Sequence, residues 1–191
     1  DGDLAVLEGV MGLYDGLGGI YEQGSSYHLA KVTQTPIILV VDAKGMGKSV
    51  LALIAGFLQY DTQHLIKGVL LNRMSKGYYD IIKPLIEKEL SVKVVGYLPE
   101  QKDIRLESRH LGLVMPDELS DIKKQLNETA DRLKKTIDMD LFMDIAAEAD
   151  EIGDSGSADI YNVKNIGNYD QNEFSQNKAI NTVNIAVAMD E

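Results

Sequence analysis

Apolar residues along the first 100 positions alternate between two spacings. Short apolar runs typical of buried parallel strands occur at Leu4–Leu7, Ile37–Val41, Val69–Leu71 and Val92–Val95. Between them, Ser49–Tyr60 and Tyr78–Leu90 carry apolar residues at helical spacing, and we expect Pro84 to bend or restart the second helix. The alternation predicts an α/β fold in which a parallel sheet is flanked by helices.

The second half of the chain is predicted to contain two helices, a linker and a final strand. After a long connection at 97–115, Pro116 is placed to begin a helix that continues to Ile137, and a second helix is predicted around Leu141–Ala149. Residues 150–178 are rich in Asp, Asn, Gly and Ser with little periodicity, which predicts a mobile linker. The predicted organisation is a partial α/β domain at 1–149, the linker at 150–178, and a strand at 179–191 that begins the next part of the domain.

Composition narrows the classes of function. The net charge of −11 comes mostly from residues 138–191, which hold 12 acidic and 2 basic side chains, and no basic stripe suited to nucleic acid is present. No apolar run reaches the 18 or more residues of a membrane span, and no secretory signal is visible. The absence of cysteine excludes disulfides, thiolate metal sites and a cysteine nucleophile within these residues. We therefore expect a cytoplasmic protein that binds neither nucleic acid nor membrane.

Polar residues follow several of the predicted strands. Glu8, Asp42 and Asn72 each come directly after an apolar run, and Asp190 and Glu191 follow the last one. Parallel strands end on one edge of a sheet, where open α/β folds bind ligands. Carboxylates there suit Mg²⁺, and the Asn amide offers the donor and acceptor needed to recognise adenine. The alternative, that these residues only cap the sheet, remains open.

Two glycine-rich segments carry possible chemistry. The run from Gly9 to Gly16 directly follows Glu8, and its glycines allow close approach to an anion, so we interpret it as a catalytic loop, with a mobile connector as the alternative. The segment Gly45–Ser49 matches only the second half of a phosphate-binding P-loop, because Asp42 stands where the first glycine is required. We do not expect this segment to hold a nucleotide phosphate, although the helix start could hold another anionic group.

These segments together resemble one enzyme family. The stretch Glu8-Gly9-Val10-Met11-Gly12-Leu13-Tyr14-Asp15-Gly16 resembles the signature of cobyrinate a,c-diamide synthases. Agreement continues, in the same order, at 38–49, 68–73, 96–99, 109–113 and 185–191, so the resemblance covers about residues 1–150 and 180–191. The chain departs from the family in carrying Gly-Lys-Ser at 47–49, in having Tyr78 and Tyr79 near a position where many members have His, and in the linker at 150–178.

The resemblance implies a P-loop NTPase-like domain similar to dethiobiotin synthetase, which this chain enters after the P-loop and leaves before a C-terminal glutaminase domain. It implies an amidoligase of vitamin B12 synthesis that activates the a- and c-carboxylates of cobyrinate with ATP as acyl phosphates, and then attaches ammonia released from glutamine. The expected cofactors are ATP and Mg²⁺, the substrate is a corrin polycarboxylate, and the fragment alone is expected to be inactive. The oligomeric state is left open, with a homodimer as one alternative.

The resemblance also implies roles for particular residues. Glu8 would be catalytic and would bind Mg²⁺, while Asn72 would contact adenine with Leu98 and Pro99 beside the base. Tyr14 and Asp15 would face the corrin. Two alternatives remain: amidation of another tetrapyrrole such as nickel-sirohydrochlorin, and a non-catalytic module derived from a nucleotide-binding domain.

Overall fold

The computed structural model describes residues 4–101, 108–109, 112–113 and 122–149, all of which fall in one structural unit. The predicted helix start at Pro116, the linker at 150–178 and the strand at 179–191 lie outside these residues.

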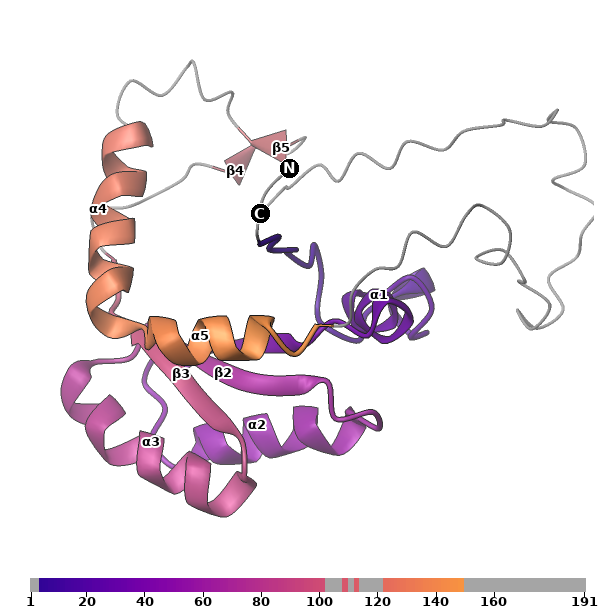
Figure 1. Cartoon of the computed structure of the whole chain (residues 1–191), viewed down its shortest axis with the longest axis horizontal. Helices are drawn as coiled ribbons and strands as arrows, with labels where there is room; N and C mark the ends of the chain where they lie inside the picture. The colour runs from indigo at the N-terminus through magenta and orange to yellow at the C-terminus, as the bar shows by residue number, and fades with distance from the viewer. Residues whose placement is uncertain (1–3, 102–107, 110–111, 114–121, 150–191) are drawn as a thin grey trace, which may run out of the picture. The chain divides into compact units, whose positions relative to one another are not determined.

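A three-stranded parallel sheet in the order β1-β2-β3 forms the centre of the fold (Figure 1). The strands are β1 (Ile37–Asp42), β2 (Ile66–Asn72) and β3 (Lys93–Leu98), and each starts or ends within a few residues of its predicted bounds. In β2, Ile66, Val69 and Leu71 are buried, as a central strand covered by helices requires. The predicted α/β class with a parallel sheet is confirmed.

Two helices cover one face of this sheet. Helix α2 (Ser49–Tyr60) has the predicted bounds, and α3 (Lys76–Leu90) begins two residues earlier than predicted. Pro84 lies inside α3 without ending it. A single apolar cluster joins the helices to the strands, and its fully buried members include Val50, Ile54, Val69, Leu71, Ile86 and Val94.

The opposite face is covered by the end of the described chain. Helices α4 (Ile122–Thr136) and α5 (Met139–Ala146) follow one another, and α5 crosses the sheet on the side away from α2 and α3 (Figure 1). The turn between them is joined to β3, because Asp138 N–H donates to the Val95 carbonyl at 2.8 Å. A Cβ on Gly96 would lie 2.4 Å from the Thr136 carbonyl oxygen, so this close approach requires glycine.

The prediction of a strand at Leu4–Leu7 is wrong. These residues have no regular secondary structure, and Leu4, Val6 and Leu7 expose 43%, 67% and 52% of their surface. A strand requires a neighbour whose backbone groups pair with it, and none of the strands that the structure describes pairs with this segment. Glu8 therefore does not stand at the end of a buried strand.

The remaining elements are short, and the sequence did not predict them. A 3₁₀ turn, η1 (Leu17–Gly19), precedes helix α1 (Ser26–Thr33), and Ser25 caps this helix by accepting from His28 N–H at 3.0 Å. Strands β4 (Ser108–Arg109) and β5 (Gly112–Leu113) pair antiparallel. Within the described helices, none is long and apolar enough to cross a bilayer.

Candidate functional site

Residues from all three strands of the parallel sheet meet at its carboxyl edge. Asp42 pairs in register with Asn72, and Asn72 pairs with Leu98, so the three strand ends stand side by side. The backbone continues this alignment, because Ala43 N–H donates to the Asn72 carbonyl and Met74 N–H to the Leu98 carbonyl. The predicted grouping of Asn72, Leu98 and Pro99 is therefore present along one edge, with all three half-buried.

The Asn72 amide is already oriented by its neighbour. Its Oδ1 accepts a hydrogen bond from Arg73 N–H at 2.9 Å, and Arg73 adopts a left-handed backbone with φ of 56°. This bond leaves the amide Nδ2 donors and the second lone pair of Oδ1 available. A purine edge that offers one acceptor and one donor could therefore be read by Asn72 without rotating its side chain.

Asp42 is held in an ion pair. Arg73 Nε donates to Asp42 Oδ1 at 2.7 Å, Arg73 Nη2 contacts Oδ2, and Lys44 N–H donates to Oδ1 at 3.2 Å. The Arg73 hydrogen bond, followed by that of Lys44, lowers the pKa of Asp42 below its usual value. Asp42 is thus charged but already bound, and it would have to leave Arg73 in order to hold a metal ion.

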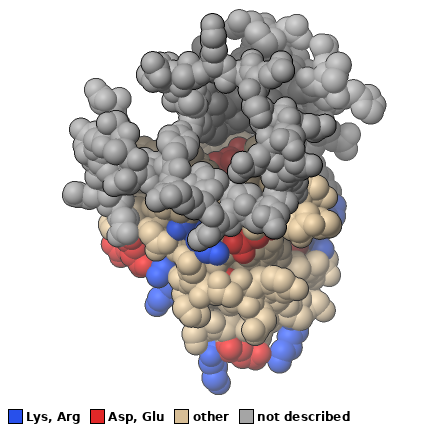
Figure 2. All heavy atoms as spheres, turned by 90° about the vertical axis from the view of Figure 1, so that its right-hand side faces the viewer, with Lys and Arg blue, Asp and Glu red and all other residues tan. Residues whose placement is uncertain are grey.

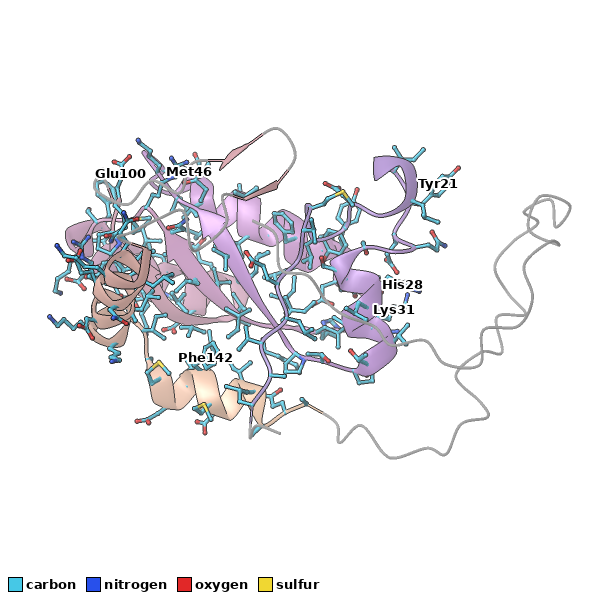
Figure 3. All side chains as sticks on the ribbon, turned by 90° about the horizontal axis from the view of Figure 1, so that it is seen from above. Tyr21, His28, Lys31, Met46, Glu100 and Phe142 are labelled. Atoms are coloured by element: carbon cyan, nitrogen blue, oxygen red, sulfur yellow. The ribbon has the colours of Figure 1, made fainter. Side chains whose placement is uncertain are left out.

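A second ion pair lies nearby and joins the ends of β1 and β3. Lys44 Nζ contacts Glu100 Oε1, and Figure 3 shows Glu100 and Met46 near one another at this end of the molecule. Lys48, the lysine of the half-matched P-loop, instead lies 3.5 Å from Glu89 of α3. Sequence reasoning missed the roles of Arg73, which directly follows β2, and of Lys44, which stands two residues after the end of β1.

The glycine-rich loop, which we define as Gly9–Gly16, lies beside α1 and the end of α2. Its Leu13 and Tyr14 pack near Ile37 and Leu65, where β1 and β2 begin, so the structure does not bring the loop together with Asn72 and Leu98 at the carboxyl edge. Its Leu13 carbonyl accepts from Tyr27 N–H of α1 at 2.9 Å, and Asp15 N–H closes a turn onto the Gly12 carbonyl at 2.9 Å. Glu8 and Asp15 are both exposed. Asp15 within the loop and Glu8 directly before it therefore both present carboxylates to solvent, and the backbone of 12–15 is held by hydrogen bonds.

Two of the loop glycines lie close to other atoms of the fold. A Cβ on Gly12 would lie 2.3 Å from Asp15 Oδ2, and a Cβ on Gly16 would lie 2.2 Å from the Gln23 carbonyl oxygen. Gly16 is buried, and its N–H donates to the Tyr21 carbonyl at 2.9 Å. Gly16 therefore needs glycine for space, whereas at Gly12 the exposed Asp15 side chain could turn aside.

Gly16→Ala is expected to lower the free energy of unfolding by about 2 kcal/mol, because its methyl group would displace backbone atoms and not a flexible side chain. Gly47→Ala is the matched control, since nothing lies within 4 Å of a Cβ there. Urea unfolding of both variants measures the difference. Equal stability of the two variants would show that the loop is not packed as described.

Charged residues around α1 pair with each other. Lys31 of α1 lies 3.1 Å from Glu22, and His28 Nδ1 accepts from Gly24 N–H at 3.2 Å. Figure 3 shows Tyr21, His28 and Lys31 together on this part of the chain, and acidic and basic side chains lie next to one another on the face shown in Figure 2. These contacts hold the segment that follows the loop. The Nδ1 atom of His28 is used in one of them, as the acceptor for Gly24 N–H.

Among the described residues, no three His, Asp or Glu side chains come together as a ready metal site. Mg²⁺ needs fewer protein ligands than this, because it keeps several waters and is often held by one or two carboxylates plus substrate phosphates. The Glu8 carboxylate is exposed and bonds to no other described residue. It fits a site to which the protein contributes one or two carboxylates.

The chain is similar to curated proteins over most of its length. It is 40% identical over 147 residues to a cobyrinate a,c-diamide synthase of Caldanaerobacter subterraneus subsp. tengcongensis, a match covering 76% of this chain and 32% of the relative. For proteins of the same name, identity is 38% with Listeria innocua (80% of this chain, 34% of the relative) and 35% with Clostridium tetani (89% and 38%). The chain thus spans about a third of the length of these relatives. No protein-family model and no solved structure matches it.

Proposed function

Because the matched part of this chain belongs to the cobyrinate a,c-diamide synthase family, we propose that the complete protein converts the a- and c-carboxylates of cobyrinate to amides in cobalamin biosynthesis. The observation that carries the proposal is 35–40% identity, extending over as much as 89% of the chain, to proteins of that name. In the proposed function, residues of the glycine-rich loop and of the strand ends would bind the substrates.

The proposed reaction has two steps. A carboxylate oxygen of the corrin attacks the γ-phosphorus of ATP, the bond to the β-γ bridging oxygen breaks, and ADP leaves an acyl phosphate behind. Ammonia released from glutamine then attacks the acyl carbon, loses a proton, and expels inorganic phosphate to give the amide. Both steps depend mainly on positioning and on neutralising phosphoryl charge, which are tasks for a preorganised site.

The carboxyl edge of the sheet would hold the adenine. The Asn72 amide keeps its two Nδ2 donors and one Oδ1 lone pair after its bond to Arg73, which supports a paired contact with the N6 and ring-nitrogen edge of adenine. Leu98 is the register neighbour of Asn72 and precedes Pro99, so apolar surface lies beside that amide. The Asp42–Arg73 pair would keep Asn72 in place by fixing the residue that follows it.

The loop carboxylates would serve the phosphates and the corrin. Glu8 would supply a carboxylate for Mg²⁺, which when bound would offset the charge that develops on the phosphoryl oxygens. Asp15 would face the corrin polycarboxylate from the same loop. The support for these roles is that both side chains are exposed, and that the Leu13 carbonyl and the Asp15 N–H, close to Asp15, are both hydrogen-bonded.

Asn72→Ala in the complete enzyme is expected to reduce discrimination between ATP and GTP by about 1–3 kcal/mol, because the paired hydrogen bonds to the adenine edge are lost. The ratio of kcat/KM for the two nucleotides measures this. Asn127→Ala is the control, since Asn127 is an exposed amide on α4. Unchanged selectivity in the Asn72 variant would remove this residue from the nucleotide site.

The function itself is tested by incubating the complete protein with cobyrinate, ATP and glutamine and identifying products by mass spectrometry. We expect a monoamide and then a diamide, and neither when ATP is omitted. Amidation of nickel-sirohydrochlorin but not cobyrinate would reassign the substrate. Absence of any ATP-dependent product would favour a non-catalytic module.

A further inference from the structure

The side chain of Tyr14 points into the protein and not toward the exposed side of the glycine-rich loop. Its ring lies 4.8 Å from that of Tyr27, 5.9 Å from that of Phe57 and 5.7 Å from that of Tyr60, measured between centroids. Its hydroxyl donates to the Phe57 carbonyl at 2.7 Å. These ring contacts and this hydrogen bond join the Tyr14 side chain to α1 and to the end of α2.

The Phe57 carbonyl belongs to the last turn of α2 and accepts two hydrogen bonds. Asp61 N–H donates to it at 3.1 Å, as expected where a helix ends, and the Tyr14 hydroxyl takes up the second lone pair. The loop is therefore attached to a rigid helix end, and the attachment adds to the bonding at the helix C-terminus.

Tyr27, whose ring packs against that of Tyr14, is itself held in place by Asp61. Asp61 is buried, and its carboxylate accepts from Leu65 N–H at 2.9 Å, Ile66 N–H at 2.7 Å and the Tyr27 hydroxyl at 2.9 Å. Tyr27 is fully buried, and its own N–H donates to the loop at the Leu13 carbonyl. One buried carboxylate thus holds the α2–β2 connection and the ring against which Tyr14 packs.

The chemistry of the Tyr14 hydroxyl suits a structural donor. Burial, followed by the nearby charge of Asp61, raises the pKa of Tyr14 well above its ordinary value, so the phenol stays protonated at neutral pH. Asp15, the next residue, is exposed. The two adjacent residues therefore differ in role. The Tyr14 side chain is bonded within the protein, whereas the Asp15 side chain is exposed at the surface.

We propose that Tyr14 is a positioning residue that anchors the glycine-rich loop to α2 and α1, holding the adjacent Asp15 carboxylate in place without touching the substrate. The role of the Asp15 carboxylate rests on the proposed function, whereas the anchoring rests on the contacts alone. It differs from the expectation that Tyr14 itself contacts the corrin.

The test compares Tyr14→Phe with Tyr60→Phe in the complete protein. Both variants lose one hydroxyl and keep the ring, but Tyr60 is 70% exposed whereas Tyr14 donates to Phe57. Hydrogen exchange of the loop amides, measured without substrate, is expected to be about fivefold faster in Tyr14→Phe and unchanged in Tyr60→Phe, as the loss of one internal hydrogen bond predicts. Tyr14→Leu, which also removes the ring, should increase the rate further.

Kinetics separate anchoring from direct contact. Tyr14→Phe should lower kcat/KM for cobyrinate about tenfold while the KM for ATP stays constant, since the carboxyl edge of the sheet is not altered. Weaker cobyrinate binding with loop exchange at the wild-type rate would show that Tyr14 contacts the substrate, and would overturn the proposal. Unchanged exchange and unchanged kinetics would also overturn it. If the protein amidates no tetrapyrrole, the exchange result still decides the anchoring and only the proposed function fails.

Discussion

Glu8→Gln is expected to slow turnover of the complete enzyme about 100-fold while substrate binding survives. The substitution keeps the shape of the side chain but removes the charge that a magnesium ligand needs, and this interaction matters most as phosphoryl charge develops. A 100-fold loss corresponds to about 2.7 kcal/mol of additional barrier. Because Glu8 is exposed and bonds to no other described residue, the variant should fold as stably as the wild type.

The control is Glu128→Gln, which removes the same charge from an exposed position on α4. Turnover and melting temperature are measured for both variants across a Mg²⁺ titration. A Glu8 variant with wild-type turnover and an unshifted Mg²⁺ requirement would exclude Glu8 from catalysis. A lowered melting temperature with normal turnover per folded molecule would instead assign Glu8 a structural role.

Asp61→Ala is expected to destabilise the fold by about 3 kcal/mol. The carboxylate is buried and accepts three hydrogen bonds, and its removal leaves the Leu65 and Ile66 N–H groups without an acceptor in a place that water does not reach. Each unsatisfied buried donor costs about 1–3 kcal/mol. The loss should appear as a lower urea midpoint with an unchanged slope.

Asp131→Ala serves as the matched control. Asp131 also forms an ion pair, with Lys134 at 3.3 Å, but both side chains are mostly exposed. Exposed pairs contribute about 0–1 kcal/mol, so this variant should stay near wild-type stability. If Asp61→Ala were no less stable than Asp131→Ala, the described hydrogen-bond network around Tyr27 could not be a main support of the fold.

The sheet and its two covering helices could be predicted because their signals are local and long. Ser49–Tyr60 shows helical spacing over its whole length, and Ile37–Val41 is an uninterrupted run of apolar residues, most of them β-branched. The assignment of Leu4–Leu7 failed for the opposite reason. A four-residue apolar run becomes a strand only when a partner strand pairs with it, and pairing is not encoded in the run itself.

Helix α1 was missed because its sequence carries little periodicity. Of its eight residues only Tyr27 and Ala30 are buried, while Leu29 and Val32 are exposed. The usable signal was Ser25, a favourable N-cap directly before the helix. Such a cap alone does not distinguish a helix start from a turn, so the sequence left this segment undefined.

The positions of Asn72 and Leu98 at the sheet edge could be predicted, but the placement of Glu8 and the orientations of the side chains could not. The order of the strands places Asn72 beside Leu98, as reasoning about parallel sheet edges anticipated. No sequence pattern revealed that Tyr14 faces inward while Asp15 faces solvent, or that Arg73 engages Asp42. These orientations depend on contacts between residues far apart in the chain, such as Tyr14 with Phe57.

The proposed acyl-phosphate reaction is tested most directly by following oxygen during amidation. The complete protein is given cobyrinate whose carboxylates carry a heavy oxygen isotope, together with ATP and glutamine, and the inorganic phosphate is analysed by mass spectrometry. An acyl phosphate formed from ATP predicts that one heavy oxygen is transferred to phosphate for each amide formed, because the oxygen that attacks phosphorus leaves with it. Amide formation without heavy oxygen in the phosphate, or transfer of label to AMP, would contradict the proposed reaction.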